Sequence, residues 1–204
     1  MDYPKLEVSI RQGSTENIPF RVETDEWAYA PIELIYQTAP VKFKVTGHAL
    51  PEGWRVAVMN VLRPKDLNAE ANPPGDDDLR QVTVVDADHV EFNDVNGAGF
   101  AKYSGGGQLA WRKPLDLSIY TQARANVRAT VGGTLRANWS TANGKLEIDV
   151  VKHAIWFRLP AADTALLTAG NNVFDIELVT AGGEVERLCL AVSVLTVLPE
   201  NTTE

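Results

Sequence analysis

The sequence predicts an all-β fold, and two observations carry that prediction. Apolar and polar residues alternate with a period of two in short runs, which places alternate side chains on opposite faces of a sheet. Asn-Gly and Gly-Gly pairs separate some of these runs, and such pairs supply the backbone angles that tight hairpin turns need. The chain has 204 residues, of which 45% are hydrophobic, so it can bury a core without cross-links.

The alternation is clearest in three segments of the C-terminal half, residues 153–159, 173–179 and 186–197. Within residues 153–159 (HAIWFRL) it puts Phe157 on the inner face of a strand and Trp156 on the outer face. The outer face of residues 186–197 is only weakly polar, so we expect another layer to cover it.

Two turns are predicted between these strands. Asn143-Gly144 and Gly182-Gly183 each separate two alternating runs, so we expect a hairpin at both places. Residues 118–129 also fit an amphipathic helix, but their small apolar residues alternate with polar ones. We therefore predict a strand with a solvated outer face there.

One short helix is predicted in the segment PAADTALLTAG. Pro160 is a favoured first helical residue, and Gly170 is a favoured residue just past a helix end. Leu159, Ala162 and Leu166 recur at roughly helical spacing, so this face can close the open end of a sandwich. We expect the helix to be a crossover that carries the chain from one sheet to the other.

The middle of the chain has a different pattern. Residues 37–111 contain shorter strand runs separated by polar loops, such as residues 63–79, in which two prolines, a glycine and three aspartates follow one another at 73–78. Long strand patterns resume only after Trp111. We infer a compact second β-unit at 37–111, inserted into a first domain made of residues 1–36 and 112–204.

The outer segments resemble the N-terminal domain of phage baseplate upper proteins and its relatives among phage tail proteins. In that family a P-x-D-L segment leads into a strand, and an AADT turn precedes a Y-D-I-E-L strand. This chain departs from the pattern at Ser118, where glycine is usual, and at Phe174, where tyrosine is usual. The residues that match are Pro114, Asp116, Leu117, Ala161, Ala162, Asp163, Thr164, Asp175, Ile176 and Glu177.

Residues 6–22 are similar to the first hairpin of the same family, in which a glycine-containing turn joins two strands. The inserted segment resembles a small β-barrel module that phage proteins share with part of ubiquitin-activating enzymes, and that module carries no ubiquitin chemistry. The residues that match it are Gly47, His48, Gly53, Asp86, Asp88, Tyr103 and Gly105. The resemblances imply an immunoglobulin-like β-sandwich interrupted by a small β-barrel.

The composition excludes several classes of protein. The single cysteine, Cys189, excludes an intrachain disulfide framework and a cysteine-based zinc site. The formal net charge of −8 disfavours nucleic-acid and anionic-lipid partners. The first residues lack a basic leader, and no run of about 18 apolar residues occurs. We expect a soluble protein without membrane insertion, nucleic-acid partner or classical export signal.

Histidines and acidic runs are the candidates for a metal or catalytic site. His48, His89 and His153 have no second ligand at a recognised metal spacing, and we expect His48 to bond its own loop. Residues 76–78 are consecutive aspartates, and residues 86–94 hold further carboxylates. The spacing in 86–94 fails the EF-hand pattern, so solvated loop charge is the better interpretation than calcium binding.

Motifs for nucleophilic catalysis are also missing from the sequence. There is no G-x-S-x-G, Cys189 lies within a predicted strand, and the glycine-rich residues 103–109 lack the lysine and helix of a phosphate loop. We therefore predict no catalytic residue, no cofactor, no metal ion and no enzymatic activity.

The tryptophans offer the best candidates for a binding surface, although core packing explains most of them more simply. Trp156 shares its predicted strand face with Ala154 and Arg158, and a tryptophan beside an arginine is typical of interface anchors. Trp54, in the inserted unit, is the third interface candidate together with Trp156 and Arg158.

We expect a structural component of a bacteriophage virion, made in the host cytoplasm and located in the tail, baseplate or neck. Its partners would be other virion structural proteins and further copies of itself. Two alternatives remain open. One is a carbohydrate-binding module that contacts the host surface through Trp54 and the loops at 64–79 and 96–107. The other is a capsid decoration protein.

Overall fold

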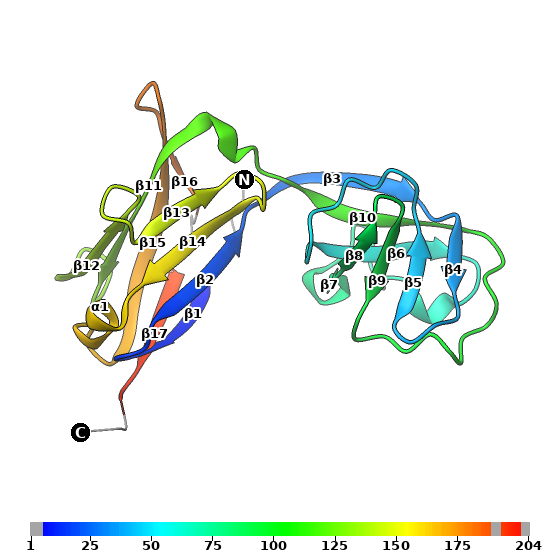
Figure 1. The fold of residues 1–204 in the computed structure, drawn as a ribbon, viewed down its shortest axis with the longest axis horizontal. Helices are drawn as coiled ribbons and strands as arrows, with labels where there is room; N and C mark the ends of the chain where they lie inside the picture. Colours follow the sequence, from blue (N-terminus) through cyan, green and yellow to red (C-terminus); the bar gives the residue numbers. More distant parts are fainter. Residues whose placement is uncertain (1–5, 189–192, 201–204) are drawn as a thin grey trace. The chain divides into compact units, whose positions relative to one another are not determined.

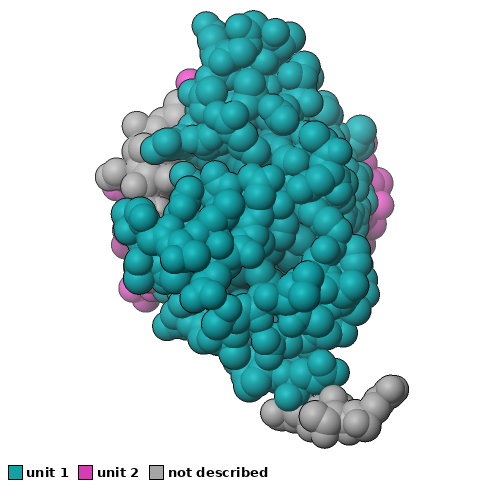
Figure 2. All heavy atoms as spheres, turned by 90° about the vertical axis from the view of Figure 1, so that its left-hand side faces the viewer, with its two compact units in different colours: residues 1–22, 115–204 teal, residues 23–114 magenta. Residues whose placement is uncertain are grey.

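The computed structural model describes residues 6–188 and 193–200. These residues form an all-β, sandwich-like fold with several sheets and one short α-helix, as the sequence predicts (Figure 1). The chain is organised as two compact units, unit 1 from residues 1–22 and 115–204 and unit 2 from residues 23–114. Figure 2 shows unit 1 as one continuous body, although its residues come from two separate stretches of the chain.

The boundaries of unit 2 differ from the expected 37–111. Strand β3 (Glu23–Pro31) pairs with β10 (Gly106–Pro114), and β4 (Leu34–Tyr36) pairs with β5 (Val41–Lys44). Residues 23–36 therefore belong to the inserted unit and not to the first domain. The sequence gives no sign of this boundary, because only one residue separates β3 from the preceding strand of unit 1.

Unit 1 consists of two sheets, and Figure 1 shows the smaller one lying over the larger one. The larger sheet has the order β1-β17-β15-β11-β12, with β16 paired to β15; the smaller sheet has the order β13-β14-β2. The bounds in the larger sheet are β1 (Glu7–Arg11), β11 (Tyr120–Arg128), β12 (Leu135–Ser140), β15 (Gly170–Thr180), β16 (Val185–Arg187) and β17 (Ser193–Leu198). The bounds in the smaller sheet are β2 (Glu16–Arg21), β13 (Leu146–Asp149) and β14 (Ala154–Leu159).

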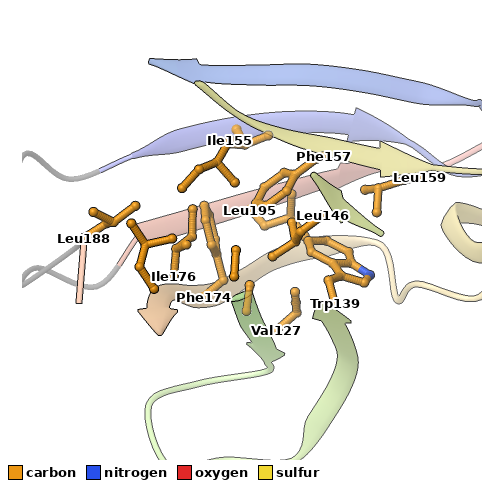
Figure 3. Close-up of a cluster of buried hydrophobic side chains, with 14 of the residues drawn as sticks. Val127, Trp139, Leu146, Ile155, Phe157, Leu159, Phe174, Ile176, Leu188 and Leu195 are labelled. Carbon is orange, nitrogen blue, oxygen red and sulfur yellow. The ribbon is translucent and has the colours of Figure 1, made fainter. Parts of the chain in front are cut away.

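Aromatic rings from both sheets form the centre of the unit 1 core (Figure 3). Phe157 on β14 is fully buried, and its ring centroid lies 4.6 Å from that of Phe20, 5.2 Å from that of Trp139 and 5.9 Å from that of Phe174. Tilted and edge-on contacts at these distances add to the stabilisation that burial of apolar area provides. The inward position of Phe157 confirms the face that the alternation predicts.

The predicted crossover helix exists but is shorter than expected. Helix α1 (Ala161–Ala165) connects β14 in the smaller sheet to β15 in the larger one, which confirms the crossover. Its inward residue is Thr164, whose hydroxyl donates to the backbone oxygens of Ser14 and Ala161. Ala162 and Leu166 are exposed, so the prediction that they face the core is wrong.

The two predicted hairpins have different outcomes. The Gly182-Gly183 turn joins β15 to β16, which pair antiparallel as expected. The Asn143-Gly144 turn joins β12 to β13, but these strands lie in different sheets and do not pair. The turn at Gly13 likewise joins β1 to β2 across the two sheets, so the hairpin that the family resemblance implies for residues 6–22 is not formed.

Unit 2 has two four-stranded sheets, ordered β3-β10-β6-β7 and β4-β5-β9-β8, and they do not close into the barrel that the resemblance implied. Their apolar faces enclose a second core that includes Trp54, Phe43 and Phe92. The remaining strands are β6 (Arg55–Val61), β7 (Arg80–Gln81), β8 (Thr83–Asp86) and β9 (His89–Phe92). Three 3₁₀ turns complete the chain, η1 (Lys65–Leu67) and η2 (Asp76–Asp78) in unit 2 and η3 (Leu117–Ile119) in unit 1.

Some expectations fall on residues 189–192 and 201–204, which lie outside the described residues. They include the position of Cys189 and the middle of the strand expected at 186–197. On either side of that gap, β16 ends at Arg187 and β17 begins at Ser193.

Candidate interaction face

The outer face of the smaller sheet in unit 1 contains two of the predicted interface residues. Strand β14 alternates, so Ile155, Phe157 and Leu159 are buried while Trp156 and Arg158 point to the other side and are half-buried. Trp156 lies in the central strand, and the sheet places it opposite Glu147 on β13 and Pro19 on β2. We call the surface made by Pro19, Glu147, Trp156 and Arg158 the Trp156 face.

Cations approach the indole ring of Trp156 from neighbouring positions. The guanidinium carbon of Arg158 lies 4.2 Å from the ring centroid, and the ammonium nitrogen of Lys152 lies 5.3 Å from it. The indole Nε1–H donates to Asp149 Oδ2 at 3.3 Å. Cation–π contacts of this kind hold a ring in one orientation while part of it stays accessible.

Two polar partners fix the orientation of Arg158. Its Nε–H donates to Glu147 Oε2 at 2.8 Å, and its Nη1 donates to Asn17 Oδ1 at 3.1 Å. Strands β13 and β2 supply these acceptors, so Arg158 links all three strands of the sheet. An arginine that is already held in place loses little side-chain entropy when a partner covers it.

Trp54, the third interface candidate, is a core residue, and its assignment to a surface is wrong. Its side chain has no exposed area, and its Nε1–H donates to the backbone oxygen of Arg112 at 2.9 Å. The sequence carries a signal for this burial, because Trp54 comes just before the apolar run of β6, in which residues 56–59 are all buried. A glycan-binding site that depends on contact with Trp54 is therefore excluded.

A second half-buried tryptophan, in unit 2, was missed from the sequence. Trp27 on β3 lies opposite Arg112 on β10, whose guanidinium carbon is 5.1 Å from the indole centroid. Tyr29, two residues further along β3, is 48% exposed. The alternation within residues 23–31 could have predicted that Trp27 and Tyr29 lie on one face of β3. Large aromatic residues alternate there with the small residues Ala28 and Ala30, which lie on the other face.

The histidines have structural roles in the described residues. His48 is buried, and its Nδ1 accepts from Leu50 N–H at 3.0 Å, a bond within its own loop as expected. Its Nε2 bonds the backbone oxygen of Asp86 at 3.0 Å, which lies at the end of β8 and was not expected. His89 Nδ1 lies 2.8 Å from Asp86 Oδ1, and its Nε2 lies 3.3 Å from the hydroxyl of Tyr36. Hydrogen bonds from the Asp88 backbone N–H and from His89 hold the pKa of the Asp86 carboxyl below its usual value.

The acidic runs are held by local hydrogen bonds. Asp78 accepts from the backbone N–H groups of Glu70 and Gly75, and these bonds lower the pKa of its carboxyl. Across residues 6–188 and 193–200, no three His, Cys, Asp or Glu side chains gather closely enough to hold a metal ion. In the same residues, no helix is both long enough and apolar enough to cross a membrane.

A half-buried carboxylate links side chains on the outer face of the larger sheet. Glu177 on β15 accepts from Arg124 Nε at 2.7 Å and from Arg187 Nε at 3.0 Å, and its side chain is only 16% exposed. Loss of water around Glu177 favours its protonated form. The bonds from the two arginines outweigh this effect, so the pKa of Glu177 is lowered.

No protein-family model and no curated protein sequence gives a significant match to this chain.

Proposed function

We propose that this protein is a structural component of a bacteriophage virion, in the tail, baseplate or neck, and that it acts by protein–protein assembly through the Trp156 face. The observation that carries the assembly role is the half-buried Trp156, fixed between Arg158 and Lys152 at the centre of a three-stranded sheet. Tryptophan and arginine are the residues most enriched at the energetic centres of interfaces.

The proposed location in a virion rests on the sequence resemblance of the outer segments. Of the residues that carry it, Thr164 and Asp163 lie in α1, and Ile176 lies in the core of β15. These are positions that shape unit 1 rather than contact a partner. The Trp156 face lies outside those positions, so it would set which neighbour this protein binds. We propose further copies and other virion proteins as its partners, and no catalytic activity.

The assembly role is tested by substitution of Trp156. We expect Trp156→Ala to lower the apparent mass of the protein in light scattering across a concentration series. In a phage that encodes the protein, we expect the same variant to reduce the number of copies in purified particles.

Trp27→Ala is the matched control, because Trp27 is also half-buried and stacked on an arginine, Arg112. It should leave both the mass and the copy number as in the wild type. Equal effects of Trp27→Ala and Trp156→Ala would contradict the assignment of assembly to the Trp156 face. Purified particles that lack the wild-type protein would contradict the virion role.

A further inference from the structure

The pair Asn-Gly occurs twice in the chain, at Asn143-Gly144 and at Asn96-Gly97. Such a pair is open to a covalent change, because the backbone nitrogen that follows an asparagine can attack the carboxamide carbon of its side chain. A glycine in the second position has no side chain to block the approach and leaves the backbone free to turn. Both pairs have the same two residues, so a large difference in their reactivity must come from the fold.

The attacking nitrogen is accessible at one pair and withheld at the other. Gly144 is exposed, and its N–H makes a long bond of 3.3 Å to the Thr141 oxygen. A Cβ on Gly144 would meet no atom of the described residues within 4 Å, its chain neighbours aside. Gly97 is buried, and its N–H donates to the Thr38 oxygen at 2.9 Å. A Cβ on Gly97 would lie 2.8 Å from Val41 Cγ2, so the backbone there has no room to turn.

The carboxamide of Asn143 is held in a way that favours attack. Its Oδ1 accepts from the backbone N–H of Ser140 at 2.9 Å and from that of Lys145 at 3.2 Å. Attack on Cγ places negative charge on this oxygen, and fixed N–H donors stabilise that charge as in an oxyanion hole. The corresponding oxygen of Asn96 accepts from Ala98 N–H at 3.0 Å. The two pairs therefore differ less in the carbonyl group than in the attacking nitrogen.

One hydrogen bond opposes the reaction at Asn143. Its Nδ2 donates to the Asn138 oxygen at 3.0 Å, and this bond must break before the nitrogen can leave. Because the bond is exposed, water replaces it and its loss slows the reaction only slightly. Release of the Gly97 nitrogen is more costly, because it leaves a buried N–H without a partner.

We propose that Asn143 is a site of spontaneous deamidation in the folded protein, through a cyclic imide with Gly144, and that the fold protects Asn96. The Gly144 nitrogen gives its proton to hydroxide and forms a bond to Asn143 Cγ. The Cγ–Nδ2 bond then breaks, and Nδ2 takes a proton from water and leaves as ammonia. Water opens the imide at either carbonyl, which gives an aspartyl or an isoaspartyl residue at position 143.

The reaction changes the turn that carries the chain from β12 to β13. A carboxylate at position 143 can still accept from the N–H groups of Ser140 and Lys145, but it cannot donate to the Asn138 oxygen. The isoaspartyl product also lengthens the main chain within the turn. This chemistry needs no partner, so the proposal holds whether or not the protein is a virion component.

The test incubates the full chain at mildly alkaline pH, in native buffer and in denaturant, and follows the peptides that contain Asn96 and Asn143 by mass spectrometry. Deamidation is measured as the mass gain from replacement of NH2 by OH, and Asn143→Asp supplies the standard for the aspartyl product. The ratio of native to denatured rate should be about tenfold higher at Asn143 than at Asn96, because only the Gly97 nitrogen must leave a buried hydrogen bond.

Gly144→Ala tests the identity of the attacking nitrogen. The added Cβ lies beside that nitrogen, so the variant should deamidate more slowly at Asn143 and at an unchanged rate at Asn96. Gly144 has a φ of 70°, so alanine is strained there, and Asn96 in the same sample reports any loss of the fold by reacting faster. Asn96→Gln is the matched control and should leave the rate at Asn143 unchanged.

A native-to-denatured ratio at Asn143 that is equal to or below the ratio at Asn96 would overturn the proposal. Such a result would mean that the fold protects both pairs, or that both react only after unfolding. A rate at Asn143 that is unchanged in Gly144→Ala would also overturn it, because the Gly144 nitrogen would then not be the attacking group.

Discussion

Units 1 and 2 are both built from two packed sheets, but they fill their centres with different chemistry. In unit 1 the central ring is that of Phe157, which meets only other rings and aliphatic side chains. In unit 2 the largest fully buried side chain is Trp54, whose indole N–H must find an acceptor and does so at the Arg112 oxygen. A central phenylalanine depends on the volume it fills, whereas a central tryptophan depends on volume and on one hydrogen bond.

The largest effect is expected from Phe157→Ala. Removal of a fully buried phenylalanine leaves a cavity and should lower the free energy of unfolding of unit 1 by about 3–5 kcal/mol. Hydrogen exchange resolved by residue would measure it. Ile119→Ala, at a residue that is 54% exposed, is the control and should have little effect. Equal loss of protection in both units would contradict their treatment as separate cores.

Trp54→Phe should have the next largest effect and should act on unit 2. The substitution keeps an aromatic ring but removes the donor to the Arg112 oxygen and some buried area, at a cost of about 2–3 kcal/mol. Protection of amides in β6 and β9 would report it. Trp156→Phe is the comparison, because Trp156 is half-buried. If Trp54→Phe lowered the free energy of unfolding by no more than Trp156→Phe does, the buried hydrogen bond of Trp54 would not be important to unit 2.

Trp156→Ala should destabilise the isolated subunit only modestly. The substitution removes the contacts of the ring with Arg158 and Lys152, each of which contributes about 0.5–1 kcal/mol at a partly exposed site. Denaturant titration at low protein concentration would measure this. A loss as large as that of Phe157→Ala would show that Trp156 supports the core, and it would weaken its assignment to an interface.

Glu177→Gln should have the smallest effect, and that effect should depend on pH. The folded-state pKa of Glu177 lies below its unfolded value of about 4.3, so its ion pairs stabilise the fold above that pH and are lost as pH falls through the folded pKa. Because both arginines are substantially exposed, we expect the substitution to lower the free energy of unfolding by about 1 kcal/mol at pH 7, and by progressively less as the pH falls through the folded pKa. A cost independent of pH would contradict the ion-pair role.

Period-two alternation predicted the strands that later proved to be β11, β14 and β15, because each buries one face against the core. It also placed Trp156 on the outer side of β14. These features depend only on neighbouring residues in one strand, so the alternation of apolar and polar residues predicts them well.

Features that depend on which strands meet could not be predicted in the same way. The Asn143-Gly144 pair fits a hairpin turn, yet the chain uses it to change sheets, and the side chain of Asn143 bonds the backbone of Asn138 and Ser140 within that turn. Strand β3 was placed in the wrong unit because its partner, β10, lies far along the chain. Trp54 is buried because it precedes β6, a strand whose residues 56–59 are buried on both faces, and a single tryptophan outside a strand pattern does not reveal this.

The most direct test of assembly through the Trp156 face is light scattering of the wild type, Trp156→Ala and Trp27→Ala over the same concentration series. We expect the wild type and Trp27→Ala to associate to the same mass, and Trp156→Ala to stay at a lower mass at every concentration. Identical masses for all three proteins would contradict assembly through the Trp156 face.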